Sequence, residues 1–386
     1  MNNFTFYVPT KVHFGKGQIS HLSELKERGD KVLMVYGGGS IKRQGLYDEA
    51  LAVLKGAGIT VYELPGVDPN PRIESVRRGV ELCKAKGIHM VLAVGGGSTI
   101  DCAKAVAAGS RYDGDPWDLV LDPGRIREAL PVYVVLTIAA TGSEMDCYAV
   151  ISDYAKHEKW DTFSPCYQPT MSILDPGYTC SVPPRQTAAG AADIFSHVLE
   201  VYFTNVPGAY VQARMCEALM QTVVHYGPIA LRDPENYEAR SNLMWASSLA
   251  LNGLLFNGSE VSWSVHPIEH ELSAFYDITH GVGLAILTPH WMDFALNERT
   301  APQFAQLGRA VWGVSGGTDM EDAQKAIART RAFFAEDLGL PRTLAQEGIN
   351  GANFAVMAAK AERSCGGDCF VPLYQKDILG ILEASR

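Results

Sequence analysis

The feature that most constrains the fold is an alternation of apolar runs with amphipathic segments over residues 31–138. Segments with helical periodicity lie at about 44–56, about 73–86 and 99–108. The apolar runs between them are KVLMVY (31–36), TVYEL (60–64), HMVLAV (89–94) and PVYVVLTI (131–138). Strands that are apolar on both faces must be covered on both faces, which predicts a parallel sheet with helices on either side.

The character of the sequence changes near Pro176. From DPGYTCSVPPRQ onward nearly all of the chain has helical periodicity, with few β-branched runs. We therefore predict a dinucleotide-binding α/β domain over residues 1–180 and an all-helical domain over residues 181–386. At the N-terminus, FTFYVPTKVHFGKG predicts two short strands around a proline, and these need a sheet edge in their own domain or in a partner subunit.

Bulk properties favour an ordinary globular protein of 386 residues, with 47% apolar and 20% charged residues. A net charge of -10 argues against a nucleic-acid partner. The N-terminus lacks the basic and apolar regions of a signal peptide, and the longest apolar run, PVYVVLTIAA, is too short to span a bilayer. We therefore expect a cytoplasmic protein with no membrane partner.

The eight cysteines are scattered along the chain without a secretory context, which predicts free thiols. Cys365 and Cys369 are an exception to this scatter, because only three residues separate them in the glycine-rich segment CGGDC. Either a second metal or redox pair, or a glycine loop that happens to hold two thiols, fits this pattern, and we favour the second interpretation.

Histidines cluster in the second half of the chain. His266, His270 and His280 fall within fifteen residues, although the chain has only 10 histidines. Upstream, Asp193 and His197 are four apart in a helical pattern and therefore share one helix face, and His266 and His270 have the same spacing. One carboxylate with several imidazoles is a ligand set for Zn²⁺ or Fe²⁺. Because a tetrahedral site uses three or four ligands, one imidazole would remain for chemistry.

The segments around these residues contain no cationic side chain. No Lys or Arg occurs from Gln186 to Ala213 or from Ser241 to Glu298. Buried helices of a large core would have this composition, and so would the surroundings of a cation site; both interpretations can hold together. An anionic substrate normally requires Arg or Lys, so the composition favours a neutral substrate.

A glycine-rich turn follows the third apolar run. Its residues Gly95, Gly96, Gly97 and Ser98 open a helix, where backbone N–H groups can approach a phosphate. Ser98 is the predicted N-cap, with Asp101 three residues later in a capping-box arrangement. A tight turn with a well-capped helix and no ligand is the alternative. The turn lacks the GxGxxG pattern and does not follow the first strand, which excludes an ordinary Rossmann fingerprint.

Two further turns follow predicted strands. TIAATGSEM (137–145) offers Thr137, Thr141 and Ser143 to a diphosphate or nicotinamide. The turn after the first strand contains Gly37, Gly38, Gly39 and Ser40. Because the carboxyl ends of parallel strands share one sheet edge, the three turns together predict one cofactor crevice.

Four segments resemble the iron-containing (group III) alcohol dehydrogenase family, and within it the butanol dehydrogenase or aldehyde reductase branch. They are GGGSTIDCAK (95–104), AATGSEM (139–145), LDPGYTCSVPPRQTAAGAADIFSHVLE (174–200) and HPIEHELSAFYDITHG (266–281). The resemblance extends over most of the chain. It implies a Rossmann-like, dehydroquinate synthase-like α/β domain followed by an all-α domain, and a homodimer formed through N-terminal strand exchange.

The resemblance also implies roles for individual residues. It makes Asp193, His197, His266 and His280 the ligands of one divalent metal, Fe²⁺ or Zn²⁺, and it places His270 beside the nicotinamide as a non-ligand imidazole. It places the cofactor diphosphate at Gly95, Gly96, Gly97, Ser98 and Asp101. It also makes Thr137 and Thr141 line the cofactor and Lys159 contact it. Lys159 is the weakest assignment, since its surroundings AKHEKWDTF match the family less well.

Position 39 bears on the choice of cofactor. Members of the resembled family that prefer NAD have an acidic residue there, which would bind the ribose 2′-hydroxyl and repel a 2′-phosphate. This chain has Gly39, with Lys42 and Arg43 nearby, so we predict a preference for NADP(H). A solvated helix start is the alternative explanation for the two cations.

The predicted activity is reversible hydride transfer between a small neutral primary alcohol or aldehyde, such as butanol or butanal, and NADP(H). Dehydroquinate synthase-like and glycerol-phosphate chemistry is disfavoured, because those substrates are anionic. Glycerol-type polyol oxidation is the nearest alternative. A nucleotide-binding protein with a structural metal is an alternative from another class.

Overall fold

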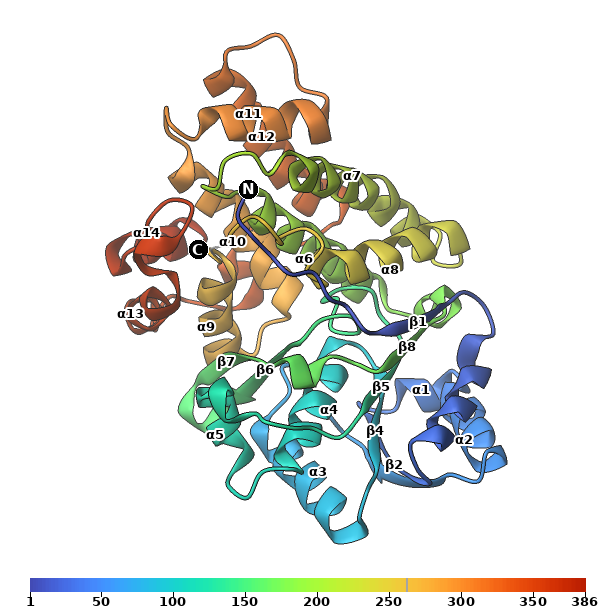
Figure 1. Ribbon diagram of the computed structural model, residues 1–386. Coiled ribbons are helices and arrows are strands. Elements are labelled where there is room, and N and C mark those ends of the chain that lie inside the picture. The colour runs from blue at the N-terminus through green and yellow to red at the C-terminus, as the bar shows by residue number, and fades with distance from the viewer. Residues whose placement is uncertain (262) are drawn as a thin grey trace. The chain divides into compact units, whose positions relative to one another are not determined.

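The computed structural model describes residues 1–261 and 263–386, and the chain forms two compact units (Figure 1). The α/β unit comprises Tyr7–Val182 and Pro234–Asn252. The helical unit comprises Met1–Phe6, Pro183–Asp233 and Gly253–Arg386. The main division therefore lies next to the boundary that we placed at 180.

The α/β unit is built on a six-stranded sheet with the strand order β1-β8-β5-β4-β2-β3. Every neighbouring pair in this sheet is parallel, which confirms the predicted sheet type. The strands are β1 (Lys11–Phe14), β2 (Lys31–Tyr36), β3 (Thr60–Leu64), β4 (Met90–Gly95), β5 (Val132–Leu136) and β8 (Met171–Leu174).

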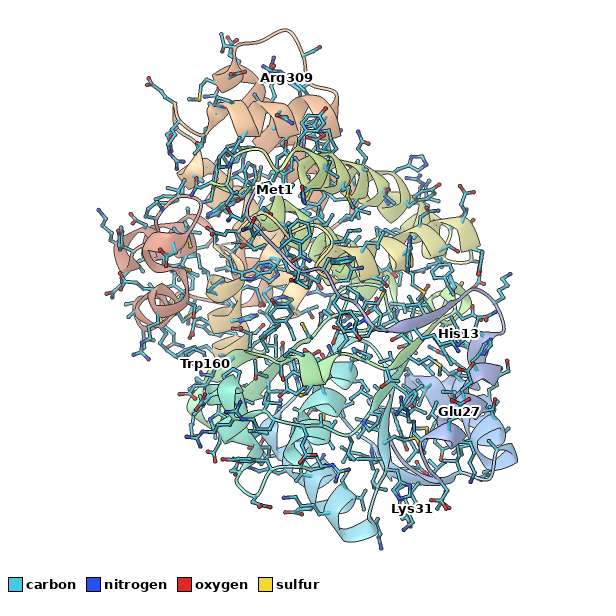
Figure 2. All side chains as sticks on the ribbon, viewed as in Figure 1. Met1, His13, Glu27, Lys31, Trp160 and Arg309 are labelled. Atoms are coloured by element: carbon cyan, nitrogen blue, oxygen red, sulfur yellow. The ribbon has the colours of Figure 1, made fainter. Side chains whose placement is uncertain are left out.

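Helices cover both faces of this sheet, as Figure 1 shows for α3 and α4 on one side and α2 on the other. Alternate strand residues point to opposite faces, so Leu33 packs with α3 and α4 whereas Val32 packs with η1 and α2. Side chains fill both layers (Figure 2). The helices of this unit are η1 (Gln18–Glu27), α1 (Ser40–Arg43), α2 (Leu46–Gly56), α3 (Ile73–Lys86), α4 (Gly97–Gly109), α5 (Pro116–Leu121), η2 (Pro123–Arg125), η3 (Tyr154–Lys156), η4 (Pro165–Tyr167), η5 (Pro176–Thr179) and α8 (Tyr237–Leu251).

The N-terminal segment differs from the prediction of two strands. Only β1 forms, and it pairs with β8 at the edge of its own unit. Pro9 lacks the N–H that a ladder requires, so pairing begins after it, at Lys11. A further hairpin that the sequence analysis did not predict, β6 (Tyr148–Asp153) and β7 (Glu158–Phe163), forms a separate two-stranded antiparallel sheet.

Helix α8 departs from the predicted all-helical domain, because it groups with the α/β unit. Two hydrogen bonds explain the grouping. The Ala140 amide donates to Ser247 Oγ at 3.0 Å, and the Ser248 hydroxyl donates to the Glu144 carboxylate. Because α8 anchors the loop after β5, it is part of the α/β unit although it follows α6 and α7 in the sequence.

The helical unit contains no strand among its described residues, in agreement with the predicted all-α architecture. Within the ranges described, no helix is long and apolar enough to cross a membrane. The helices of this unit are α6 (Pro184–Tyr202), α7 (Tyr210–Arg232), α9 (His266–Tyr276), α10 (His280–Ala295), α11 (Ala301–Trp312), α12 (Asp319–Ala332), η6 (Phe333–Asp337), η7 (Leu344–Glu347), α13 (Phe354–Cys365), η8 (Gly366–Asp368) and α14 (Gln375–Ala384).

Candidate functional site

Three helices of the helical unit bring the predicted metal ligands together. Asp193 and His197 lie one turn apart on α6, His266 is the first residue of α9, and His280 is the first residue of α10. One donor atom from each of the four lies within 4.8 Å of the other three. The close approach of α10 to α6 depends on Gly281, because a Cβ there would overlap the backbone of α6.

A buried carboxylate fixes the orientation of His266. Glu200 accepts the backbone N–H groups of Ser264 at 2.5 Å, Val265 at 2.9 Å and His266 at 3.2 Å, and it also contacts His266 Nδ1. With Nδ1 held in this way, His266 Nε2 carries the lone pair. That atom is buried and has no hydrogen-bond partner among the residues that the structure describes.

The other two imidazoles are oriented in the same way. His280 Nδ1 contacts the Glu269 carboxylate, and its Nε2 lies 3.7 Å from Asp193 Oδ1. His197 Nδ1 donates to the backbone carbonyl oxygen of Asp193 at 2.9 Å. All three rings therefore bond an oxygen through Nδ1, which leaves each Nε2 as the metal-competent nitrogen.

Glu200 and Glu269 were missed in the sequence analysis. Both are almost fully buried, at 2% and 0% exposure. A signal was present, since each lies three residues after a candidate ligand in a segment without Lys or Arg. A buried carboxylate requires a partner, and here the partners are imidazoles, backbone amides and the Ser273 hydroxyl.

Burial and neighbouring charges set the protonation of the cluster. Burial, reinforced by His266 and His280, holds the pKa of His197 well below its ordinary value, so this imidazole is neutral. Burial also acts to lower the pKa of His266, but the charge and hydrogen bond of Glu200 outweigh it and raise that pKa.

The donor set fits a divalent cation. Three imidazole nitrogens and one carboxylate oxygen match the ligand types and number of a tetrahedral zinc or ferrous site. The buried carboxylates Asp193, Glu200 and Glu269 also place negative charge in a region whose sequence supplies no Lys or Arg. A cation would balance that charge and would use the unpartnered Nε2 of His266.

His270 lies at the edge of this cluster. Its ring centroid is 5.6 Å from that of His280 and 6.4 Å from that of His266. Its side chain is half-buried, unlike that of His266 one helical turn earlier. It can also form a smaller donor group with Glu269 and His280.

The three glycine and threonine turns lie at one edge of the sheet in the α/β unit. They follow β5, β4 and β2, which are neighbours in the strand order. The Thr137 amide donates to the Gly95 carbonyl at 3.0 Å. A Cβ at Gly96 would overlap Ile138, and one at Gly97 would overlap Thr141. Only glycine therefore allows the turn at 95–98 to pack against the turn after β5.

The predicted capping role of Ser98 is wrong, and so is the capping-box arrangement proposed for Asp101. Helix α4 already begins at Gly97, and no side chain caps it. Asp101 instead accepts the Ser143 hydroxyl at 2.6 Å and the Val150 amide at 2.9 Å. Burial raises the pKa of Asp101 to about 6. Its carboxyl group thus anchors the chain after β5.

A fully buried lysine completes this anchor and was not singled out in the sequence analysis. Lys104 Nζ donates to Ser143 Oγ at 2.9 Å, to Asp146 Oδ1 at 2.7 Å and to the Tyr148 carbonyl at 2.8 Å. Lysine is rarely buried unless it is paired. The buried Lys104 ammonium therefore ties the end of the turn at 137–145, and the residues just after it, to α4.

The remaining predicted cofactor residues lie in two places. Gly37, Gly38, Gly39 and Ser40 form the turn after β2, where Gly39 has a φ of 95°. Lys42 Nζ lies 5.1 Å from the ring centroid of Tyr36. Lys159 lies on β7, and its Nζ donates to Asn70 Oδ1 at 2.9 Å.

Comparison with known proteins identifies the family. Residues 9–176 match "Iron-containing alcohol dehydrogenase", and residues 187–386 match "Fe-containing alcohol dehydrogenase family, C-terminal". The chain is 52% identical to NADH-dependent butanol dehydrogenase B of Clostridium acetobutylicum, with 100% of both chains covered. It is 40% identical to the NADPH-dependent aldehyde reductase YqhD of Escherichia coli, covering 94% of this chain and 93% of that one.

A solved structure supports the same assignment. The crystal structure of NADH-dependent butanol dehydrogenase A from Thermotoga maritima has a TM-score of 0.95 and 38% identity, covering 100% of this chain and 99% of that chain. The family matches account for both the parallel-sheet region and the helical region. The chain belongs to the iron-containing alcohol dehydrogenase family.

Proposed function

We propose that the protein is a metal-dependent, NADP(H)-linked enzyme that interconverts small neutral primary alcohols and their aldehydes. Family membership makes it an alcohol and aldehyde oxidoreductase. The names of its relatives, butanol dehydrogenase and aldehyde reductase, support the substrate class. The main support for the proposal is that four potential metal donor atoms, from residues on α6, α9 and α10, lie within 4.8 Å of one another.

In this proposal Asp193, His197, His266 and His280 hold Fe²⁺ or Zn²⁺. A divalent cation held there would act as a Lewis acid that stabilises negative charge on the substrate oxygen. Glu200 and Glu269 keep the proton of their imidazoles on Nδ1, so that Nε2 remains a donor. His270, which lies at the edge of the cluster, is the residue that we assign to cofactor positioning or proton relay.

The cofactor assignment rests on the turns of the α/β unit. NADP(H) would supply or accept the hydride, with its diphosphate at Gly95, Gly96, Gly97 and Ser98, where backbone amides open α4. Asp101 acts indirectly, by anchoring the chain after β5.

The preference for NADP(H) rests on the absence of a carboxylate at Gly39 and on the ammonium of Lys42 close by. The relatives are divided on this point, since their names specify NADH in some and NADPH in another.

The testing experiment is the initial rate of butanal reduction, followed by nicotinamide absorbance, with NADPH and NADH in parallel. Protein loaded with Zn²⁺ or Fe²⁺ is compared with protein treated with a chelator. We expect chelator-sensitive turnover that is faster with NADPH, and we expect His280→Ala to lose metal and activity together. Full metal occupancy in that variant would contradict the ligand assignment. Turnover of glycerol but not of butanal would favour the polyol alternative, and no turnover at all would favour a non-redox role.

We also propose a homodimer. Several apolar side chains at the N-terminus are exposed, with Phe4 at 50%, Phe6 at 47% and Tyr7 at 78%. A second subunit would remove this apolar surface from water. Sedimentation of the wild type as a monomer at micromolar concentration would refute the assignment.

A further inference from the structure

Two buried thiols lie at the end of helix α13. Cys365 is the last residue of that helix, and Cys369 follows after the turn Gly366–Asp368. The two cysteines are 5% and 3% exposed, whereas Gly367 and Asp368 between them are exposed. The Cys369 Sγ lies 3.3 Å from the Cys365 carbonyl oxygen, so the pair closes a compact loop.

Both thiols hold the segment that leads into His266. The Cys365 thiol donates to the Ser264 carbonyl at 3.6 Å, and the Cys369 thiol lies 3.4 Å from the Trp263 carbonyl. The same segment is held from its amide side by Glu200, which accepts the N–H of Ser264. The backbone immediately before His266 is therefore bound between one carboxylate and two thiols.

The two thiols are chemically unequal. When Cys369 ionises, the Cys365 S–H can turn from the Ser264 carbonyl to the Cys369 sulfur, and this hydrogen bond lowers the pKa of Cys369 and raises that of Cys365. Cys369 is thus the group that ionises and attacks, because the thiolate is the nucleophile in thiol–disulfide exchange. Gly366 combines a φ of 52° with a ψ of -150°, a backbone conformation that suits glycine and shapes the loop.

We propose that Cys365 and Cys369 form a reversible disulfide that loosens His266 and so weakens retention of the divalent metal. The metal part of this inference rests on the proposed function. In the step, the Cys369 thiolate attacks a disulfide oxidant such as oxidised glutathione and releases one glutathione thiol. The Cys365 thiol then displaces the second, giving one protein S–S bond. The two electrons and two protons lost by the cysteines appear in the two glutathione thiols.

Loss of the S–H groups explains the effect on the metal. A disulfide sulfur cannot donate a hydrogen bond, so the Ser264 carbonyl loses its thiol donor, and the Trp263 carbonyl loses the Cys369 proton that it shares with the Cys365 carbonyl. The S–S bond of about 2.05 Å also draws Cys369 toward the helix end, away from the position of a free thiol. Disturbing the supports of a ligating histidine typically costs about tenfold or more in metal affinity.

The test uses zinc-loaded full-length protein treated with oxidised glutathione, or with dithiothreitol as the reduced state. Peptide mapping by mass spectrometry locates the disulfide, and a chromophoric chelator reports the rate of zinc release. The Cys365→Ser/Cys369→Ser variant keeps small hydroxyl donors but cannot oxidise. Cys216→Ser, at a buried thiol on α7, is the matched control and should behave as wild type.

We expect a disulfide between Cys365 and Cys369, zinc release about tenfold faster than from reduced protein, and recovery with dithiothreitol. The double variant should show no change on oxidation. Absence of this disulfide under conditions that oxidise glutathione-sensitive thiols would overturn the proposal, as would equal zinc release from oxidised and reduced protein. A reduced protein that holds no zinc would instead overturn the metal assignment itself, and the peptide map is independent of that result.

Discussion

Replacing Glu200 by Gln tests whether a buried carboxylate determines which nitrogen of His266 can bind metal. In the wild type the carboxylate accepts hydrogen bonds from three backbone N–H groups and contacts Nδ1 of His266. Glutamine keeps the size of the side chain but offers only one oxygen. Its amide NH₂ must then point either at the amides of Ser264 and Val265 or at His266.

Each orientation has a cost. If the NH₂ faces the Ser264 and Val265 amides, two pairs of donors oppose each other and the segment is displaced. If it faces His266, the imidazole must accept at Nδ1, which moves the ring proton to Nε2 and removes the lone pair meant for the metal. Loss of a charge-assisted hydrogen bond should destabilise metal-free protein by about 1.5–3 kcal/mol. Loss of the ligand's support should weaken zinc binding about 10–100-fold.

Competition with a chromophoric chelator measures the zinc affinity, and urea denaturation of metal-free protein measures the stability. Glu271→Gln is the matched control, because Glu271 is a buried carboxylate on the same helix as His266 whose cation partner is Lys360, at 3.1 Å. We expect its zinc affinity to stay within about twofold of wild type, since Glu271 is not among the grouped metal donors. Wild-type zinc affinity in Glu200→Gln would refute the reasoning.

Three further outcomes follow from the structure. Gly39→Asp should shift the ratio of kcat/KM toward NADH by about tenfold or more, because one negative charge near a 2′-phosphate costs about 1 kcal/mol per unit charge even in water; Gly39→Asn, with the same strain at a φ of 95°, should not shift it. Burial raises the pKa of Glu144 from 4.5 to about 7, so the free energy of unfolding of the wild type should fall as pH rises through that window. Glu144→Gln lacks this ionisation. Between pH 4 and pH 8 its free energy of unfolding, measured by urea denaturation, should therefore rise by about 3 kcal/mol relative to that of the wild type. His270→Gln should lower kcat while metal content, measured by mass spectrometry, stays at the wild-type level.

Much of the fold was predictable because local patterns and tertiary structure agree. The apolar run at 31–36 is β2 and that at 60–64 is β3, and the helix expected over 73–86 is α3. The β6–β7 hairpin was missed because β7 (EKWDTF) carries charged residues among its apolar ones, and because the two strands pair with each other in a separate sheet and not with the main one. The grouping of α8 with the sheet was also missed, since it depends on long-range hydrogen bonds of Ser247 and Ser248 that no local pattern reveals.

The candidate site, too, has parts that local sequence predicts and parts that depend on tertiary contacts. Spacing along a helix was enough to place Asp193 beside His197, because residues four apart share a face. That these residues meet His280, the first residue of α10, follows only from helix packing at Gly281. The capping role predicted for Ser98 failed because α4 already begins at Gly97, and the role predicted for Asp101 failed because Ser143 and Val150 bind its carboxylate instead.

The absence of Lys and Arg from residues 186–213 and 241–298 gains a sharper explanation from the structure. A lysine ammonium near Glu200 or Glu269 would compete with the imidazoles for these carboxylates, and its charge would oppose a cation nearby. The histidines would then lose the acceptors that hold their Nδ1 protons. The lack of Lys and Arg is typical of a buried core. Here it also keeps the carboxylates of Glu200 and Glu269 bonded to the imidazoles of His266 and His280. Leu272 is buried three residues after Glu269 on α9 and therefore lies on the same helix face. Leu272→Lys should accordingly weaken zinc binding more than Leu272→Met, which fills similar space without the charge.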